Sequence, residues 1–168
     1  MTQVQGRRPA TRRASPRVLD AVGLLLRLGL AGVLGYAGWT KITDLTGSVQ
    51  NVVAYQLFPY ELARAIGVLL PVVELALAAL LLVGLLTRVS ALLAALLMVA
   101  FIAGIASAWA RGLAIDCGCF GTGGPVAPED TRYLAEMVRD TGFLAMALWL
   151  AVRPRTLASL DTTVRKGS

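Results

Sequence analysis

Four apolar stretches constrain the fold of this chain most, because each is long enough to cross a lipid bilayer, for which about 20 residues suffice. They cover residues 18–39, 65–86, 89–110 and 133–152. The third carries no charge, whereas the fourth holds Glu136, Arg139 and Asp140 in its first two turns. Hydrophobic residues make up 57% of the chain, which argues against a water-soluble enzyme. We therefore expect an all-α fold, a four-helix transmembrane bundle.

Both ends of the chain are polar. The full length of 168 residues is that of a single domain. We expect residues 18–153 to form the membrane domain, with cytoplasmic tails at residues 1–17 and 154–168. The first tail holds five arginines and no acidic residue. A cleaved signal peptide is the rival interpretation, but the stretch is long for one and is broken by Arg27, so a retained helix is expected.

The distribution of positive charge predicts the orientation. With the N-terminus inside, ten Lys and Arg residues lie on the cytoplasmic side and five on the other. Positive residues favour the cytoplasmic side of membrane proteins. We therefore expect an N-in, C-in protein of the bacterial inner or plasma membrane. This distribution accounts for the net charge of +6 without a nucleic-acid partner. The expected partner is the lipid bilayer.

The outer loop after the first span predicts a short amphipathic helix. Ser48 is a candidate N-cap, and apolar residues recur from Val49 to Leu57 at helical spacing before Pro59 ends the segment. We expect this helix to lie flat on the outer membrane surface.

Cys117 and Cys119 are the only cysteines, and they fall in the second outer loop, where disulfides form and persist. A ring closed across one glycine departs from relaxed geometry, and strained disulfides are the labile or catalytic kind. The sequence therefore predicts a redox pair. The alternatives are two unpaired packing cysteines or a local structural bridge. With no histidine in the chain, a metal site needs more ligands than it offers alone, and none is expected.

Arg27 and Glu74 are the ionisable residues expected near mid-membrane, where charges usually face the bundle and pair. Counting residues from the predicted helix ends places them at similar depths, so we expect them to pair. The pair serves either to hold two helices together or to line a polar site for a quinone head group or a proton path. Lys41, with Asp44, is expected near the cysteine loop, where an ammonium group would lower a thiol pKa. Ordinary interfacial anchoring is the alternative for both.

Four motifs carry a resemblance to a known family: Arg27-Leu-Gly29, Gly38-Trp-Thr-Lys41, Leu70-Pro71-Val-Val-Glu74 and Asp116-Cys-Gly-Cys-Phe-Gly121. Over about residues 19–153 the chain resembles the DoxX-like superfamily of four-helix membrane proteins, and within it the MauE type. The resemblance implies an extracytoplasmic, redox-associated membrane protein. MauE proteins are linked to maturation of methylamine dehydrogenase, whose small subunit needs many disulfides, and DoxD-like relatives belong to a thiosulfate:quinone oxidoreductase.

These observations predict thiol–disulfide exchange through Cys117 and Cys119 with an extracytoplasmic thioredoxin-like protein or a dehydrogenase subunit. Electrons would pass toward quinone, for which Arg27, Glu74 and Lys41 are the candidate residues. The chain would then be a component of a thiol–disulfide or quinone oxidoreductase. The alternative is a non-catalytic assembly or anchor subunit of an oxidoreductase complex. A small-solute carrier is a third and weaker alternative, because no matched, interrupted half-helices are evident.

Overall fold

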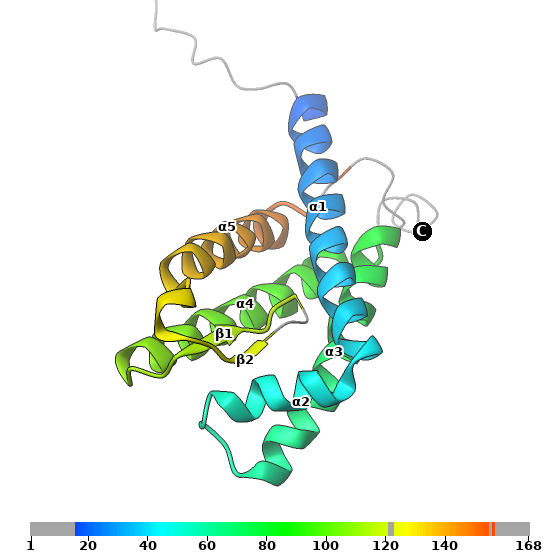
Figure 1. The fold of residues 1–168 in the computed structure, drawn as a ribbon. Helices are drawn as coiled ribbons and strands as arrows, with labels where there is room; N and C mark the ends of the chain where they lie inside the picture. The colour runs from blue at the N-terminus through cyan, green and yellow to red at the C-terminus, as the bar shows by residue number, and fades with distance from the viewer. Residues whose placement is uncertain (1–15, 121–122, 155, 157–168) are drawn as a thin grey trace, which may run out of the picture.

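The computed structural model describes residues 16–120, 123–154 and 156, so the two predicted tails lie almost wholly outside the described residues. The described chain is mostly helical (Figure 1). Its elements are α1 (Pro16–Thr43), α2 (Leu45–Ala54), α3 (Tyr60–Val83), α4 (Thr87–Ala110), β1 (Ile115–Cys117), β2 (Gly123–Pro125), the 3₁₀ helix η1 (Pro128–Asp130) and α5 (Tyr133–Val152).

Three helices, α1, α3 and α4, are long and apolar enough to cross a membrane. They confirm the coarse prediction of a multi-pass membrane protein. α5 forms at the predicted residues, but three charged side chains in its first two turns lower its apolar character. The fourth span and the N-in, C-in orientation remain predictions.

The long helices form two pairs. α1 packs along α3 and α4 packs along α5, whereas α3 and α4 touch much less, although a short turn joins them. At the turn, Gly84 takes a left-handed conformation with φ +70° and ends α3. Fully buried apolar residues close the bundle near this turn, among them Leu30, Leu81, Ala94 and Leu150. Away from it, α3 and α4 diverge (Figure 1).

The register between α1 and α3 corrects the predicted pairing of Arg27 with Glu74. Gly38 lies against Glu74, since a Cβ built at Gly38 would stand 3.1 Å from the Glu74 Cβ. Arg27 precedes Gly38 by 11 residues, about 16 Å along the helix. Glu74 pairs instead with Lys41 at 2.9 Å, and Arg27 Nη1 donates to Thr156 Oγ1 at 2.8 Å. The prediction failed because counting from helix ends ignores the N-terminal turns of α1 that project beyond α3 (Figure 1).

The short helix predicted after the first span forms as α2, but its predicted N-cap is wrong. Asp44 caps the helix by accepting from the Gly47 amide at 2.9 Å, so the helix begins before Ser48. Ser48 is buried and its hydroxyl donates to the Gly67 carbonyl of α3 at 2.7 Å. α2 is therefore fastened to α3, and its contact with the membrane surface stays a prediction.

A small antiparallel hairpin follows α4 and was not predicted. Ile115 pairs with Pro125 and Cys117 with Gly123. The hydroxyl of Tyr133, the first residue of α5, accepts from the Ile115 amide at 3.0 Å and donates to the Leu113 carbonyl. The hairpin is thereby anchored to α5 and carries both cysteines into the interior.

Candidate functional site

The hairpin turn fixes the two cysteines. Cys117 ends β1, and Gly118 follows with φ +65°, a left-handed conformation that glycine adopts at no steric cost. A Cβ at Gly118 would also lie 2.4 Å from Asn51 Nδ2 of α2. Glycine is therefore the residue that this turn requires between the two cysteines. Cys117 and Cys119 are both free and buried, with 8% and 7% of their surface exposed.

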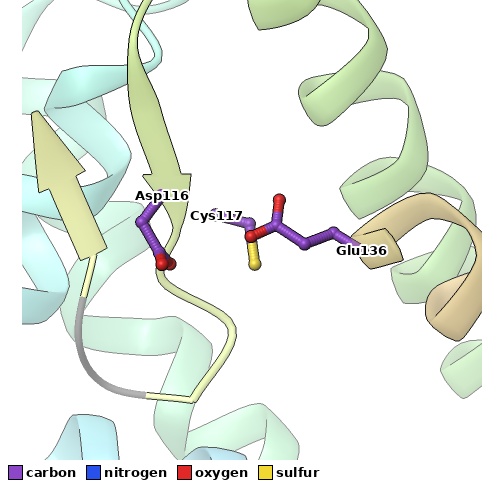
Figure 2. A group of neighbouring side chains, drawn as sticks. All are labelled: Asp116, Cys117 and Glu136. Carbon is purple, nitrogen blue, oxygen red and sulfur yellow. The ribbon is translucent and has the colours of Figure 1, made fainter. Parts of the chain in front are cut away.

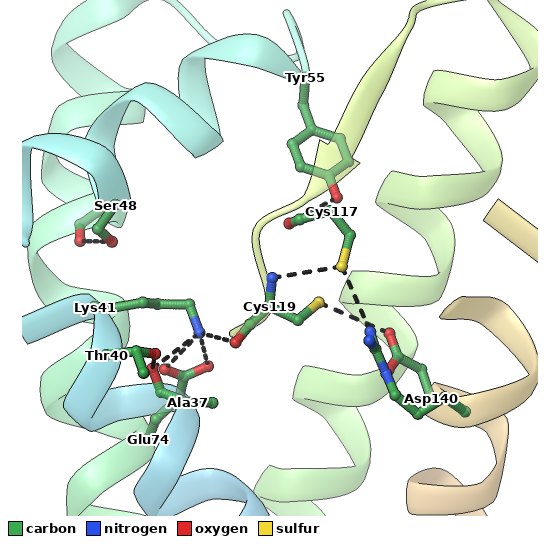
Figure 3. Close-up of polar contacts among 11 residues, drawn as sticks. Ala37, Thr40, Lys41, Ser48, Tyr55, Glu74, Cys117, Cys119 and Asp140 are labelled. Carbon is green, nitrogen blue, oxygen red and sulfur yellow. Dashed lines mark hydrogen bonds and ion pairs between the residues drawn. The ribbon is translucent and has the colours of Figure 1, made fainter. Parts of the chain in front are cut away.

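Cys117 lies in a setting that favours the thiolate. The Arg139 Nη2 atom of α5 approaches its sulfur at 3.4 Å, and the Cys119 amide donates to the same sulfur at 3.4 Å (Figure 3). A hydrogen bond from the Cys119 side chain, supported by Arg139, lowers the pKa of Cys117 despite burial. A thiolate is the nucleophilic form of cysteine, so Cys117 is the better attacking group.

Cys119 has the opposite character. Its hydrogen bond to Cys117 and its burial raise the pKa of the Cys119 thiol. The Cys119 sulfur lies 4.0 Å from Asp140 Oδ2, and Arg139 binds the other oxygen of that carboxylate at 2.9 Å (Figure 3). Cys119 is thus held as a thiol beside a buried carboxylate that can receive its proton.

Two further carboxylates lie near Cys117. Ligand atoms of Asp116, Cys117 and Glu136 fall within 4.8 Å of one another (Figure 2). Glu136 is only 6% exposed, and its Oε2 has no hydrogen-bond partner among the described residues. This arrangement has the spacing of a metal site, but the Arg139 guanidinium contacts the same sulfur and opposes a bound cation. Proton transfer from Cys117 suits the group better.

Tyr55, which directly follows α2, contacts the hairpin from the other side. Its hydroxyl donates to the Cys117 carbonyl at 3.2 Å (Figure 3). Burial, with the neighbouring thiols and carboxylates, raises the pKa of Tyr55 far above its usual value. The phenol is therefore a neutral donor that fixes the backbone at the first cysteine.

Lys41 reaches the cysteine loop, but through the backbone. Its ammonium group donates to both Glu74 oxygens at 2.9 and 3.0 Å, to the Cys119 carbonyl at 2.7 Å and to the Ala37 carbonyl at 3.3 Å (Figure 3). Lys41 therefore ties α1, α3 and the loop together. The cation placed against a thiol is Arg139, not Lys41, and Arg27 lies apart from this group.

Arg139, Asp140 and Glu136 were not predicted to take part in the site. The available signal was their i, i+3, i+4 spacing, which places them on one face of a helix. Nothing in that spacing says that the face turns toward the cysteine loop. Nothing in the sequence indicated that Asn51 and Tyr55 belong to the site, since they were known only to lie in or near the predicted short helix.

Comparison with known proteins identifies the family. The chain matches the model of the methylamine utilisation protein MauE over residues 19–153. The chain belongs to the MauE family. A MauE relative from Paracoccus versutus, the "Methylamine utilization protein MauE", is 36% identical over 152 residues, which cover 85% of this chain and 78% of the relative. No solved structure matches the chain significantly.

The MauE match confirms the predicted resemblance at the level of this family, whereas the wider DoxX-like label remains a prediction. The matched MauE region includes Lys41, Glu74, both cysteines and the charged face of α5. The site described above therefore lies wholly inside the part of the chain that defines the family.

Proposed function

We propose that this MauE-family protein carries out thiol–disulfide exchange through Cys117 and Cys119 at the outer face of the bacterial inner membrane. The observation that supports it best is the unequal setting of the two thiols. Arg139 lies against Cys117, whose pKa is lowered, first by the hydrogen bond to Cys119, and Asp140 lies against Cys119, whose pKa is raised. One attacking and one resolving thiol are what exchange through a mixed disulfide requires.

The exchange runs in two steps. The Cys117 thiolate attacks a partner disulfide, so that a Cys117–partner disulfide forms and one partner thiolate leaves. Cys119 then gives its proton to Asp140, and its thiolate attacks the Cys117 sulfur. The Cys117–Cys119 disulfide forms and the second partner thiolate leaves. In the reverse direction, the oxidised pair takes two electrons from a partner dithiol and leaves it as a disulfide.

The reverse direction suits the maturation of an extracytoplasmic enzyme, in which disulfides must be made. The relative's name refers to methylamine utilisation, and we propose the same process for this chain. The partner is then a thioredoxin-like protein or a dehydrogenase subunit outside the membrane. The predicted N-in, C-in orientation would place the hairpin on that side.

Burial of both thiols favours a second candidate, a non-catalytic assembly or anchor subunit. With only 8% and 7% of Cys117 and Cys119 exposed, a partner reaches either sulfur only if the hairpin moves. In this candidate the hairpin shapes a docking surface and its thiols do not react.

Trapping distinguishes the two candidates. In Cys119→Ser, Cys117 can attack but no thiol resolves the intermediate, so a covalent complex with the partner should accumulate on non-reducing gels and vanish with reductant. Cys117→Ser, the matched control, should trap far less, because the remaining thiol has a raised pKa.

The Cys117→Ser, Cys119→Ser double variant is the decisive comparison. Exchange predicts that maturation of the associated enzyme stops while the amount of membrane protein stays near wild type. Normal maturation in the double variant would overturn exchange and leave the assembly subunit.

A further inference from the structure

A cavity of about 490 Å³ adjoins the cysteine loop. It lies between α3 and α4 where these helices diverge, and residues of α2 also line it. Its walls are almost entirely apolar, and Cys117, Gly118 and Cys119 form part of its surface. Small-molecule sites have volumes of roughly 300–1,000 Å³, so the cavity is large enough for an organic ligand.

The cavity runs from the middle of a membrane helix to its outer end. On α4 its lining extends from Leu97 to Ser107, about 15 Å along the axis. Leu57 and Phe58, which also line it, are 44% and 45% exposed. Because the α3 and α4 linings belong to candidate membrane spans, a ligand can enter from the lipid.

Asn51 supplies an unused polar group in this apolar wall. Its side chain lines the cavity and is 5% exposed, and neither Nδ2 nor Oδ1 has a hydrogen-bond partner among the described residues. Leaving a buried amide unsatisfied is costly. A ligand carbonyl would accept from Nδ2 and satisfy the donor half of the amide. Three other polar residues of the lining already donate elsewhere: Lys41 to the Glu74 carboxylate and two carbonyls, Ser48 to the Gly67 carbonyl and Tyr55 to the Cys117 carbonyl.

We infer that the cavity binds an isoprenoid quinone, with its ring beside Cys117, Gly118 and Asn51 and its tail toward the lipid. The inference rests on the proposed function, because a disulfide that oxidises its partner is reduced to a dithiol and must be reoxidised. In that step the two S–H bonds break and one S–S bond forms between Cys117 and Cys119. Two electrons and two protons pass to the quinone, which becomes a quinol.

This location differs from the quinone site expected from the sequence. Lys41 lines the cavity, but Glu74 and Arg27 are not among its lining residues. Glu74 is fully buried and bound to Lys41, and Arg27 lies near Thr156. We therefore assign the hydrogen bond to the quinone head group to Asn51, in place of the charged residues predicted from the sequence.

The first test is stoichiometric. Reduced protein in quinone-free phosphatidylcholine nanodiscs is mixed with decylubiquinone without oxygen, and thiols and quinol are both counted. The expected result for the wild type is the loss of two thiols per quinol formed. The Cys117→Ser, Cys119→Ser variant should form no quinol. Thiols that survive excess decylubiquinone in the wild type would overturn the inference.

Two variants then test the location. Asn51→Leu removes the donor, and the KM for decylubiquinone should rise about tenfold, as expected for one lost hydrogen bond. Its melting temperature should not fall, because an unsatisfied buried amide is also removed. Ala103→Phe fills the cavity wall on α4 and should slow quinone-driven thiol oxidation at least tenfold. Ala110→Phe is the matched control, since Ala110 is exposed on the same helix away from the cavity.

The outcomes separate this inference from the proposed function. Wild-type quinone kinetics in both Asn51→Leu and Ala103→Phe would overturn the cavity as the quinone site, even if the Cys119→Ser trap still captures a partner. Slowed oxidation of the thiols by quinone, with an intact trap, would support both the site and the exchange. Normal enzyme maturation in the double cysteine variant would overturn the exchange itself.

Discussion

The two ends of the helix bundle differ in the kind of side chain that they bury. Near the turn between α3 and α4, the interior consists mainly of close-packed apolar side chains such as Leu81 and Ala94, both fully buried, with the buried Arg27 beside them. Near the hairpin, several charged groups are buried close together, including Lys41, Glu74 and Asp140. The apolar end holds the helices together, while the polar end keeps reactive and unsatisfied groups out of water. We therefore expect substitutions at the apolar end to change stability without changing thiol reactivity, whereas substitutions at the polar end can change both.

The largest effect is expected at Lys41–Glu74, which is more deeply buried than the other ion pair of that end, Arg139–Asp140. Glu74→Gln removes the charge that balances Lys41 in a fully buried position. Breaking a buried pair from one side costs about 3–5 kcal/mol. We expect a loss of that size in the free energy of unfolding, measured by denaturant titration in detergent.

Adding Lys41→Met to Glu74→Gln should recover much of this loss, because no unpaired charge then remains. Glu61→Gln, an exposed carboxylate on the same helix, serves as the control and should change little. Strictly additive single effects in the double-mutant cycle would contradict direct coupling of Lys41 and Glu74.

The apolar end is tested by Leu81→Ala. Removing a fully buried leucine leaves a cavity, which costs about 3 kcal/mol in typical cores. Thermal unfolding should shift down, while the alkylation rate of Cys117 should stay at the wild-type value. Leu82→Ala on the same helix, where the side chain is 60% exposed, should leave stability nearly unchanged. A large change in thiol reactivity in Leu81→Ala would show that the two ends are coupled.

The sequence predicted the helices better than their mutual contacts, for a physical reason. A run of apolar residues long enough to span a bilayer predicts a helix locally, and α5 forms at the predicted residues 133–152. Which residues of α1 lie level with Glu74 depends on two helices at once. The register is fixed by the close approach at Gly38, which no single segment reveals.

The candidate site was predictable only in part for the same reason. Cys117 and Cys119 stand out as the chain's only thiols, so they were found directly. The hairpin was missed because its three-residue strands are too short to show alternation, and one of them is Gly123–Pro125. Arg139 and Asp140 were located in the first two turns of the predicted fourth span, but only the packing of α5 against the hairpin brings them to the sulfurs.

The smallest expected effect sharpens the comparison at the polar end itself. The pKa of Cys117 is lowered by the hydrogen bond from the Cys119 side chain and by the Arg139 guanidinium, so the thiolate persists at a pH below the usual range for cysteine. Arg139→Gln removes one of these two causes. The pKa of Cys117 should rise, and the curve of iodoacetamide alkylation rate against pH should move to higher pH. At pH 7 the rate in a Cys119→Ser background should fall by up to about tenfold, which corresponds to one pKa unit.

Arg132→Gln, an exposed cation just before α5, is the control and should leave the curve in place. An unmoved curve in Arg139→Gln would mean that the guanidinium does not stabilise the thiolate, and the distinction between an attacking Cys117 and a resolving Cys119 would then rest on their mutual hydrogen bond alone.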